Sequence, residues 1–317
     1  MCLFVPSPMQ VSFVIPLYNC LSFTRETVAS LQATLPRGLA HEIILVDDGS
    51  TDGTREWLAG LAAPFRVVLN ERNLGYAAAN NRGAALATGK YLALLNNDLV
   101  LTPGWLEPML GALQQLASRA GLVGNVQRNA RTGAIDHAGI FINLKGKPEH
   151  AREFPSGFAR FFTTVLPADA VTGACLLLER SLWQQLGGFD EGYVNGCEDV
   201  DLCFRAGAAG RINAVALRSV IGHHVSTTPG RKVRNEENTY RLTRRWRAEL
   251  VNRSVRRWSR HYYELSPPET PGAARAFSWP IWLHAIGLRQ TPPPEAISAM
   301  NAAIDAELAR WGKMFGT

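Results

Sequence analysis

The sequence has few cysteines, and they follow no metal-binding or disulfide pattern. The five are Cys2, Cys20, Cys175, Cys197 and Cys203, an odd number that contains no Cys-X-X-Cys pair. A disulfide framework or a structural zinc site is therefore not expected. Reduced thiols fit a cytoplasmic protein.

The chain also lacks a hydrophobic run that is long enough to span a bilayer. Its longest apolar runs are short, as in Ile43–Val46, whereas a membrane-spanning helix needs about 20 apolar residues. The segment Met1–Gln10 has no basic stretch followed by a long apolar run, so it does not resemble a signal peptide. We expect a cytoplasmic protein that reaches any lipid-linked molecule by peripheral contact with the inner face of the plasma membrane.

A strong charge imbalance is absent as well. The net charge is +6 over 317 residues, with most of the excess late in the chain. We therefore expect no nucleic-acid partner, and an anionic small substrate or a membrane surface fits this charge equally well. The 46% hydrophobic and 19% charged content is typical of an ordered globular protein with one large or two modest domains.

Hydrophobic patterning in the first hundred residues predicts alternating strands and helices. Apolar strands are predicted at residues 11–17, 42–46, 66–69 and 91–95, and helices at 24–34, near Thr54 and at 76–87. Strands that are apolar throughout are typical of a parallel sheet with helices on both faces. The sequence thus predicts an α/β fold with a mostly parallel twisted sheet.

The pattern changes after Pro103. We expect a helix at 105–118, loop-rich sequence to about Pro167, a buried strand at 170–179, and helices at 181–186 and 198–209. A basic, aromatic helix is predicted at 241–263, proline-rich linkers at 267–271 and 292–294, and a last helix at 295–313.

Polar side chains follow three of the predicted strands. The clusters are Tyr18-Asn19, Asp47-Asp48 and Asn96-Asn97-Asp98. In a parallel sheet, ligands bind beyond the carboxyl ends of the strands, which share one edge. Each cluster alone would also suit an ordinary turn, but three at one edge favour a nucleotide site.

Asp98 is the candidate metal ligand, because it directly follows a buried strand. A divalent ion such as Mn²⁺ or Mg²⁺ takes carboxylate and phosphate oxygens and often bridges a diphosphate. One carboxylate is too few, and the His223-His224 pair could provide a second ligand. The alternative for this pair is a strand with one buried and one exposed imidazole.

A second acidic cluster, Glu198-Asp199-Val200-Asp201, opens a predicted helix. Acids at a helix N-terminus also act as caps and interact with the helix dipole, which accounts for one acid better than for three. A base that deprotonates a sugar hydroxyl must be a carboxylate or a histidine, so this cluster contains candidates for that role.

Together these motifs resemble the family 2 glycosyltransferases with the GT-A fold, a Rossmann-like fold of nucleotide-diphospho-sugar transferases. The likeness is strongest to rhamnosyltransferase-like bacterial members that build cell-surface polysaccharides. It covers about residues 10–230, through the motifs Val14–Asn19, Val46–Thr54, Asn73–Gly75, Asn81–Gly83, Ala87–Gly89, Leu95–Asp98, Thr172–Ala174, Gly187–Glu191, Glu198–Arg205 and His223–Ser226. The resemblance implies a GT-A domain over residues 1–240, with a donor half at about 10–100 and an acceptor and catalytic half at 101–240. A helical extension would follow over 241–317.

The resemblance also implies roles for single residues. Asp199 would be the catalytic base, with Glu198 as its partner. Asn96-Asn97-Asp98 matches the DxD metal motif, of which only the last acid remains, and the resemblance leaves open whether His223 or His224 is the second ligand. The implied donor-binding residues are Pro16, Tyr18, Asn19, Asp47, Asp48, Asn73, Asn81, Asn96, Asn97, Asp98 and Gly173.

The implied function is an inverting transfer of a sugar from dTDP-rhamnose or a UDP-sugar to a hydroxyl of a glycan or lipid-linked acceptor in cell-surface polysaccharide synthesis. Two alternatives are a nucleotidyltransferase and a non-catalytic nucleotide-sugar-binding module on a similar fold. A nucleotidyltransferase would need a glycine-rich phosphate loop with a lysine near the first strand. Residues Ile15–Asn19 contain neither glycine nor lysine. The second has no need of a catalytic base, whereas Asp199 is present.

The predicted helix at 241–263 combines arginines with tryptophans. Its arginines are Arg241, Arg244, Arg245, Arg247, Arg253, Arg256, Arg257 and Arg260. Trp246, Leu250, Trp258 and Tyr262 recur at about four-residue spacing and give the helix an apolar face. Such a helix could lie on an anionic membrane near a lipid-linked acceptor, or pack on a core with a solvated basic face.

Overall fold

The computed structural model describes residues 10–154, 163–224, 234–262 and 278–316. Cys2, the Val225-Ser226 end of the last motif and the linker at 267–271 lie outside the described residues. The chain forms two compact units, of residues 1–140 with 150–235 and of residues 141–149 with 236–317. The second unit thus combines the C-terminal helices with a short segment from the middle of the chain.

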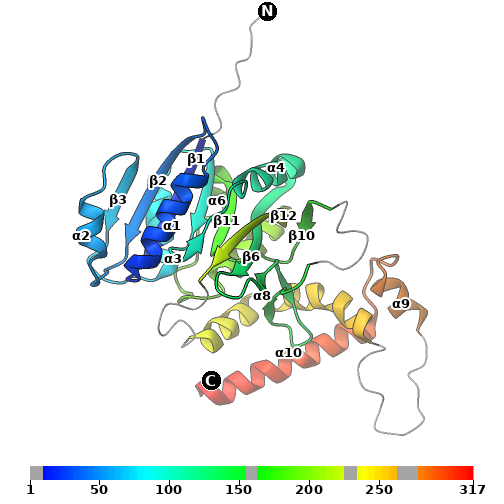
Figure 1. The fold of residues 1–317 in the computed structure, drawn as a ribbon. Coiled ribbons are helices and arrows are strands. Elements are labelled where there is room, and N and C mark those ends of the chain that lie inside the picture. The colour runs from blue at the N-terminus through cyan, green and yellow to red at the C-terminus, as the bar shows by residue number, and fades with distance from the viewer. Residues whose placement is uncertain (1–9, 155–162, 225–233, 263–277, 317) are drawn as a thin grey trace, which may run out of the picture. The chain divides into compact units, whose positions relative to one another are not determined.

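The first half of the first unit alternates strands and helices as predicted. Its elements are β1 (Gln10–Leu17), α1 (Leu21–Thr34), β2 (Ala40–Asp47), α2 (Thr54–Ala59), β3 (Phe65–Leu69), α3 (Tyr76–Leu86) and β4 (Tyr91–Leu95). The strands run parallel in the order β3-β2-β1-β4 (Figure 1). The predicted α/β architecture, with a mostly parallel sheet flanked by helices, is confirmed.

The second half of this unit extends the same sheet. Its elements are β5 (Leu99–Val100), α4 (Leu106–Leu116), β6 (Ala120–Asn129), β7 (Ile135–His137), β10 (Val165–Pro167), β11 (Cys175–Glu179), α6 (Arg180–Leu186), α7 (Glu198–Ala208) and β12 (Ile212–His223). Strand β11 lies antiparallel between β4 and β6, and β12 pairs with β6 in parallel. The sheet therefore joins the two polar strand-end regions, after β4 and after β12, in one unit.

Helices cover both faces of the sheet because successive strand residues point to opposite sides. On one face, Phe13 and Ile15 of β1 belong to a buried cluster with Leu31 of α1 and Met109 of α4. On the other face, Val14 of β1 packs against α3. Alternating strand residues are thus buried on both sides, as the continuous apolar strands require.

The expectation of loop-rich sequence between 118 and 167 is wrong for its first part, because β6 occupies 120–129. The sequence did not predict this strand because glycines and polar residues interrupt its apolar pattern. These residues are Gly121, Gly124, Asn125 and Gln127. Asn125 and Gln127 are nevertheless buried, and the amide of Gln127 donates to Asn125 Oδ1 at 3.3 Å. Polar side chains that are satisfied within a sheet break the apolar pattern without breaking the strand.

The second unit is built from helices and one hairpin. It contains α8 (Asn235–His261), α9 (Trp279–Ala285) and α10 (Pro294–Phe315), and the tip of the hairpin formed by β8 (Ile140–Ile142) and β9 (Pro148–His150). Lys147 of the hairpin pairs with Glu307 of α10 at 2.7 Å. Glycine is needed at Gly146, since a Cβ there would lie 2.4 Å from Ile304 Cγ1.

Helix α8 contains most of the predicted basic helix, but it begins six residues earlier, at Asn235, and ends at His261. Leu242, Leu250, Val251 and Val255 are buried, and the backbone departs from helical angles at Trp246. Several arginines contact partners within the unit, as in the Arg247–Asp305 and Arg253–Glu249 ion pairs. These contacts agree with the interpretation of a packed helix with a solvated basic face.

Two helical glycines of the first unit make a matched test of this packing. A Cβ on Gly83 of α3 would lie 2.4 Å from Val14 Cγ1 and 2.9 Å from Val46 Cγ2, whereas nothing lies within 4 Å of one on Gly111 of α4. We expect Gly83→Ala to lower the free energy of unfolding by about 1–3 kcal/mol through overpacking. Gly111→Ala should raise it by up to about 1 kcal/mol. Equal midpoints of both variants in denaturant unfolding would contradict this packing.

Candidate active site

The loops after β1, β2 and β4 contact one another at the carboxyl edge of the sheet. The amide of Asn97 donates to Thr24 Oγ1 at 2.9 Å and to the Asn19 carbonyl at 3.4 Å. Asn19 in turn accepts a hydrogen bond from Thr51 N at 2.8 Å and donates its own N–H to Ser50 Oγ at 2.8 Å. The three polar strand ends that the sequence singled out therefore form one continuous region.

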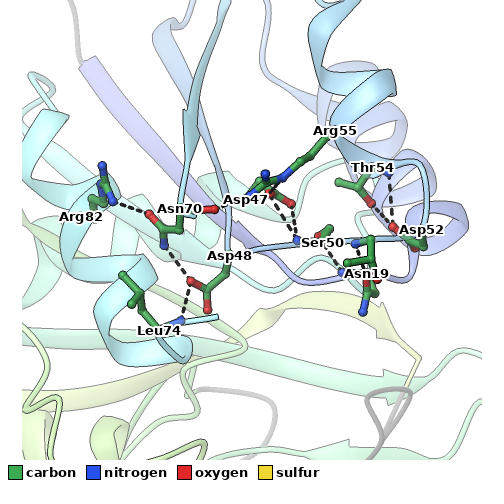
Figure 2. A network of polar contacts seen from close by, with 11 residues as sticks. Asn19, Asp47, Asp48, Ser50, Asp52, Thr54, Arg55, Asn70, Leu74 and Arg82 are labelled. Carbon is green, nitrogen blue, oxygen red and sulfur yellow. Dashed lines mark hydrogen bonds and ion pairs between the residues drawn. The ribbon is translucent and has the colours of Figure 1, made fainter. Parts of the chain in front are cut away.

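Asp47 is buried in this region and bound by its neighbours. Its side chain is fully buried, and its carboxylate accepts the Ser50 N–H at 3.2 Å and the Arg55 Nε–H at 2.8 Å (Figure 2). Arg55 also donates to the Asn70 carbonyl. Asp47 thus fixes the loop after β2 against α2 and against the end of β3.

Asp48 ties the same strand end to the start of α3. Its Oδ1 accepts the Asn70 amide at 2.7 Å and the Leu74 N–H at 2.9 Å, and its Oδ2 accepts the Gly75 N–H at 2.9 Å. Arg82 of α3 holds Asn70 from the other side at 2.6 Å (Figure 2). Each carboxylate oxygen offers two lone pairs. The described hydrogen bonds therefore use both lone pairs of Asp48 Oδ1 and one lone pair of Oδ2.

The remaining predicted donor residues of this edge differ in exposure. Pro16 is buried within β1 opposite Val46, whereas Tyr18 and Asn73 are exposed beyond the strand ends. Gly49 has a φ of +82° and allows the backbone at Asn73 to approach, because a Cβ there would lie 2.8 Å from Asn73 N. The side chains of Tyr18 and Asn73 are thus available at this edge.

A histidine stands between two carboxylates at the end of β12. His223 Nε2 lies 3.4 Å from Asp98 Oδ1, and His223 Nδ1 lies 3.5 Å from Asp136 Oδ2. His223 and Asp98 are almost fully buried. The hydrogen bond with His223 holds the pKa of Asp136 below its usual value, against the opposite effect of partial burial. Asp136 therefore favours an imidazole whose Nδ1 carries a proton and whose Nε2 faces Asp98.

His224 points elsewhere. Its Nε2 lies 3.0 Å from Glu26 Oε2, and its ring packs 4.6 Å from the ring of Phe23, both residues of α1. Of the two imidazoles, that of His223 is the one beside the Asp98 carboxylate, whereas His224 contacts Asp98 through its backbone N–H, which donates to the Asp98 carbonyl at 2.9 Å. Within the described ranges, no three His, Cys, Asp or Glu side chains gather into a metal-binding group.

The three acids at the start of α7 have different surroundings. Glu198 is buried and accepts the Gly196 N–H at 2.6 Å. Asp201 is fully buried and pairs with Arg205 at 2.8 Å. Asp199 is half-buried, and its two oxygens each accept one backbone N–H, from Gly173 at 2.7 Å and from Val200 at 2.8 Å. Asp199 is therefore the acid of this cluster that keeps both exposure and lone pairs.

Tyr76 connects the start of α3 to this acid. Its hydroxyl donates to the Gly173 carbonyl at 2.7 Å, and the Gly173 N–H donates to Asp199. A Cβ on Gly173 would lie 3.0 Å from the Tyr76 oxygen, so the close approach favours glycine. The two halves of the unit thus meet at Gly173.

Asn81 holds a different loop. Its amide exchanges two hydrogen bonds of 2.9 Å with the backbone of Phe189 and also donates to Glu191 at 2.9 Å. This contact fixes the Gly187–Glu191 motif against α3.

Sequence reasoning missed three contributors to the site: Tyr76, Asn70 and Asp136. Tyr76 directly follows the Asn73–Gly75 motif, which was a usable signal. Asn70 and Asp136 lie outside every motif, and Asp136 falls in a stretch that the sequence predicts as loop-rich. Their contacts to Asp48 and His223 span 22 and 87 residues, so no local pattern contains them.

The sequence comparison with known families decides the assignment. The family model described as "Glycosyl transferase family 2" matches residues 12–187. The chain belongs to this family. All three strand-end clusters lie inside the matched region.

Several named proteins are similar over most of the chain. The uncharacterized protein y4gI of Sinorhizobium fredii is 32% identical over 83% of this chain and 29% of its own length. The O-antigen biosynthesis protein RfbC of Myxococcus xanthus is 30% identical over 69% of this chain and 18% of its own length. An N-acetylglucosaminyl-diphospho-decaprenol L-rhamnosyltransferase of Mycobacterium tuberculosis is 29% identical over 64% of this chain and 72% of its own. The chain thus spans less than a third of y4gI and of RfbC.

Solved structures of glycosyltransferases share the fold. GalNAc-T7, solved with UDP, GalNAc and Mn²⁺, superposes with a TM-score of 0.63 at 20% identity, over 83% of this chain and 52% of that one. Staphylococcus aureus TarS 1-349 in complex with UDP-GlcNAc gives a TM-score of 0.58 at 16% identity, over 98% of this chain and 93% of that one. The predicted GT-A fold is therefore confirmed.

Two acids of α7 should differ in how much stability their substitution costs. Asp201→Asn removes the charge that pairs with the largely buried Arg205, so we expect the free energy of unfolding to fall by about 3 kcal/mol. Asp199→Asn keeps an oxygen for one backbone N–H at a half-buried position and should cost less than about 1 kcal/mol. Chemical unfolding of both variants measures the difference, and a larger loss for Asp199→Asn would contradict the assigned surroundings.

Proposed function

We propose that the chain transfers a sugar from a nucleotide-diphosphate sugar to an acceptor hydroxyl with inversion at the anomeric carbon. One observation carries the proposal: Asp199 is a half-buried carboxylate that two backbone N–H groups hold in place. Those bonds occupy one lone pair on each oxygen and leave the others for an acceptor proton. Asp199 would take that proton as the hydroxyl attacks the anomeric carbon, from the side opposite the departing diphosphate.

The neighbouring acids suit supporting roles better than that of the base. Glu198 is bound to Gly196 N, and Asp201 is committed to Arg205. We propose that Glu198 shapes the backbone turn that leads into α7 and thereby orients Asp199. This turn includes Cys197, whose φ of +70° is rare for a residue other than glycine.

We propose that the donor is dTDP-rhamnose or a UDP-sugar, bound at the edge that Asp48 organises. The open lone pair on Asp48 Oδ2 suits an N–H of a pyrimidine base, and the exposed Tyr18 and Asn73 are candidates to flank the nucleotide. Asp47 and Asn81 would act by holding loops, since Asp47 is fully buried and Asn81 is bound to Phe189. The rhamnosyltransferase relative and the UDP-containing structures support this donor class.

A divalent cation, Mn²⁺ or Mg²⁺, fits the residues at the end of β4. Asp98 offers an oxygen and His223 a nitrogen, and a cation held by two side chains completes its ligands with phosphate oxygens and water. The buried Asn96 Oδ1 accepts no hydrogen bond from any described residue. A group of the bound nucleotide sugar could therefore still bind to this oxygen. When bound, the cation would stabilise the negative charge of the leaving diphosphate.

We propose a glycan or lipid-linked acceptor, as in cell-surface polysaccharide synthesis, reached from the inner face of the plasma membrane. The names of the rhamnosyltransferase and O-antigen relatives support this acceptor class. None of the helices in the described ranges has both the length and the apolar character of a membrane span.

The first test of the proposal compares the three acids of α7. Asp199→Asn keeps the shape of the side chain but binds a proton far more weakly, so turnover should fall by about 10²–10⁴-fold. The affinity for the nucleotide should change little, because the base acts on the acceptor. Glu198→Gln and Asp201→Asn are compared at equal folded fraction, measured by circular dichroism.

Near-normal turnover in Asp199→Asn, with collapse in a folded Glu198→Gln, would assign the base to Glu198. Binding of nucleotide sugar by the wild type without any donor hydrolysis or sugar transfer would favour the non-catalytic module instead.

The second test concerns the cation. Asp98→Ala should abolish the additional thermal stabilisation that Mn²⁺ gives to the protein with UDP or dTDP. Asp136→Asn should weaken the apparent Mn²⁺ affinity by about 10–100-fold, because the imidazole of His223 loses its orienting carboxylate. His224→Ala is the matched comparison and should leave Mn²⁺ affinity nearly unchanged. Activity and stabilisation that survive exhaustive chelation would rule out a cation at Asp98.

A further inference from the structure

Helix α9 of the second unit exposes large apolar side chains on one face. Trp279 is 63% exposed, Trp282 37% and Ile286 49%. The spacing of three and then four residues places them on one side of the helix. Leu288, two residues farther on, is 75% exposed. We name these four residues the α9 apolar surface.

The opposite face of α9 anchors the helix. Ile281, His284 and Ala285 are buried, and His284 Nδ1 lies 2.9 Å from Ser259 Oγ of α8. The Ser259 hydroxyl donates to the Val255 carbonyl at 3.0 Å, so it accepts from His284. The buried face therefore fixes α9 to α8 and leaves the α9 apolar surface exposed on the other side. Helix α9 has apolar side chains on both its buried and its exposed face.

Arginines lie beside the C-terminal end of α9. Arg260 Nε donates to the Ala285 carbonyl at 3.2 Å, and a Cβ on Gly287 would lie 3.9 Å from Arg256 Nη1. Burial, and then the charges of Arg256 and Arg289, lower the pKa of His284. The sequence contains no Asp or Glu in residues 250–262 or 278–291. The end of α8 and Arg289, just after α9, thus provide arginines, and neither of these two sequence segments contains a carboxylate.

We propose that the α9 apolar surface docks on an anionic lipid bilayer, with its tryptophans at the level of the head groups. Tryptophan is enriched at that level because its ring is apolar and its N–H is polar. The flanking arginines would face anionic phosphates, which attract basic side chains close to the surface. The absence of acids from both segments is what favours an anionic surface as the occupant.

This surface differs from the candidate membrane surface that the sequence suggested, which was the apolar face of the helix at 241–263. Leu242, Leu250, Val251 and Val255 of α8 are buried, and the large aromatic residues Trp246 and Trp258 of this helix, with Tyr262 just after it, are partly buried. Helix α8 therefore contributes arginines and support, and α9 contributes the side chains that enter the bilayer. The inference rests on the proposed function only in that a lipid-linked acceptor gives the docking a purpose.

The test measures sedimentation of the full chain with vesicles of phosphatidylcholine, with and without phosphatidylglycerol. We expect binding to the anionic vesicles, and binding at least about tenfold weaker for the double variant Trp279→Ser with Leu288→Ser. Met314→Ser is the matched control, because Met314 is 59% exposed near the far end of α10. It should bind like the wild type, and added salt should weaken both.

Arg256→Gln combined with Arg289→Gln should remove the preference for phosphatidylglycerol. Equal binding by the wild type and the tryptophan–leucine variant would overturn the proposal, as would no binding at all. A different result would be self-association of the wild type in the absence of vesicles, abolished by Trp279→Ser with Leu288→Ser. This result would assign the surface to a second copy of the chain instead. Transfer to a soluble acceptor is measured separately, so failure of docking and failure of the transferase proposal give different results.

Discussion

Two buried carboxylates at the end of β2 need hydrogen-bond donors, and the elements around them provide these donors. Asp47 is fully buried and Asp48 is 3% exposed, so either charge would be costly without partners. Arg55 of α2, Asn70 after β3 and the backbone before α3 satisfy them. The strand end, α2 and the start of α3 are therefore coupled, and the edge is organised before a ligand arrives.

The same requirement is met differently at the start of α7. Glu198 and Asp201 are bound by protein groups that take them out of reach, while Asp199 receives only backbone N–H groups and remains half-buried. The Tyr76–Gly173 hydrogen bond joins this acid to the turn that Asp48 fixes. Two sets of acids far apart in the sequence are thus linked through a few backbone groups, and each set leaves one carboxylate with spare lone pairs.

Much of the first half of the first unit could be predicted because its signals are local. An apolar run that ends in polar residues marks β1, β2 and β4 within a few residues of their observed bounds. The rest of the chain was harder to predict. In the first unit, β6 buries the polar residues Asn125 and Gln127 inside the sheet, and in the second unit α9 is only seven residues long. In the site, the acid cluster at α7 was visible, but its division into one accessible and two committed acids depends on Arg205, Gly173 and Gly196. The role of Asp136 depends on a contact across the sheet.

Strand β12 reaches Asp98 only after a change of register. Ala216 lies opposite Asn125 and Val220 opposite Val126, so residues 217–219 bulge out of the ladder with β6. Adjacent strand residues face opposite sides, and a bulge resets which side each later residue faces. One more residue in this bulge would bring His224 to the position that His223 holds beside Asp98, whereas one residue fewer would bring Gly222 there. The two adjacent histidines therefore keep an imidazole beside Asp98 when the bulge lengthens by one residue, which a single histidine at position 223 would not do.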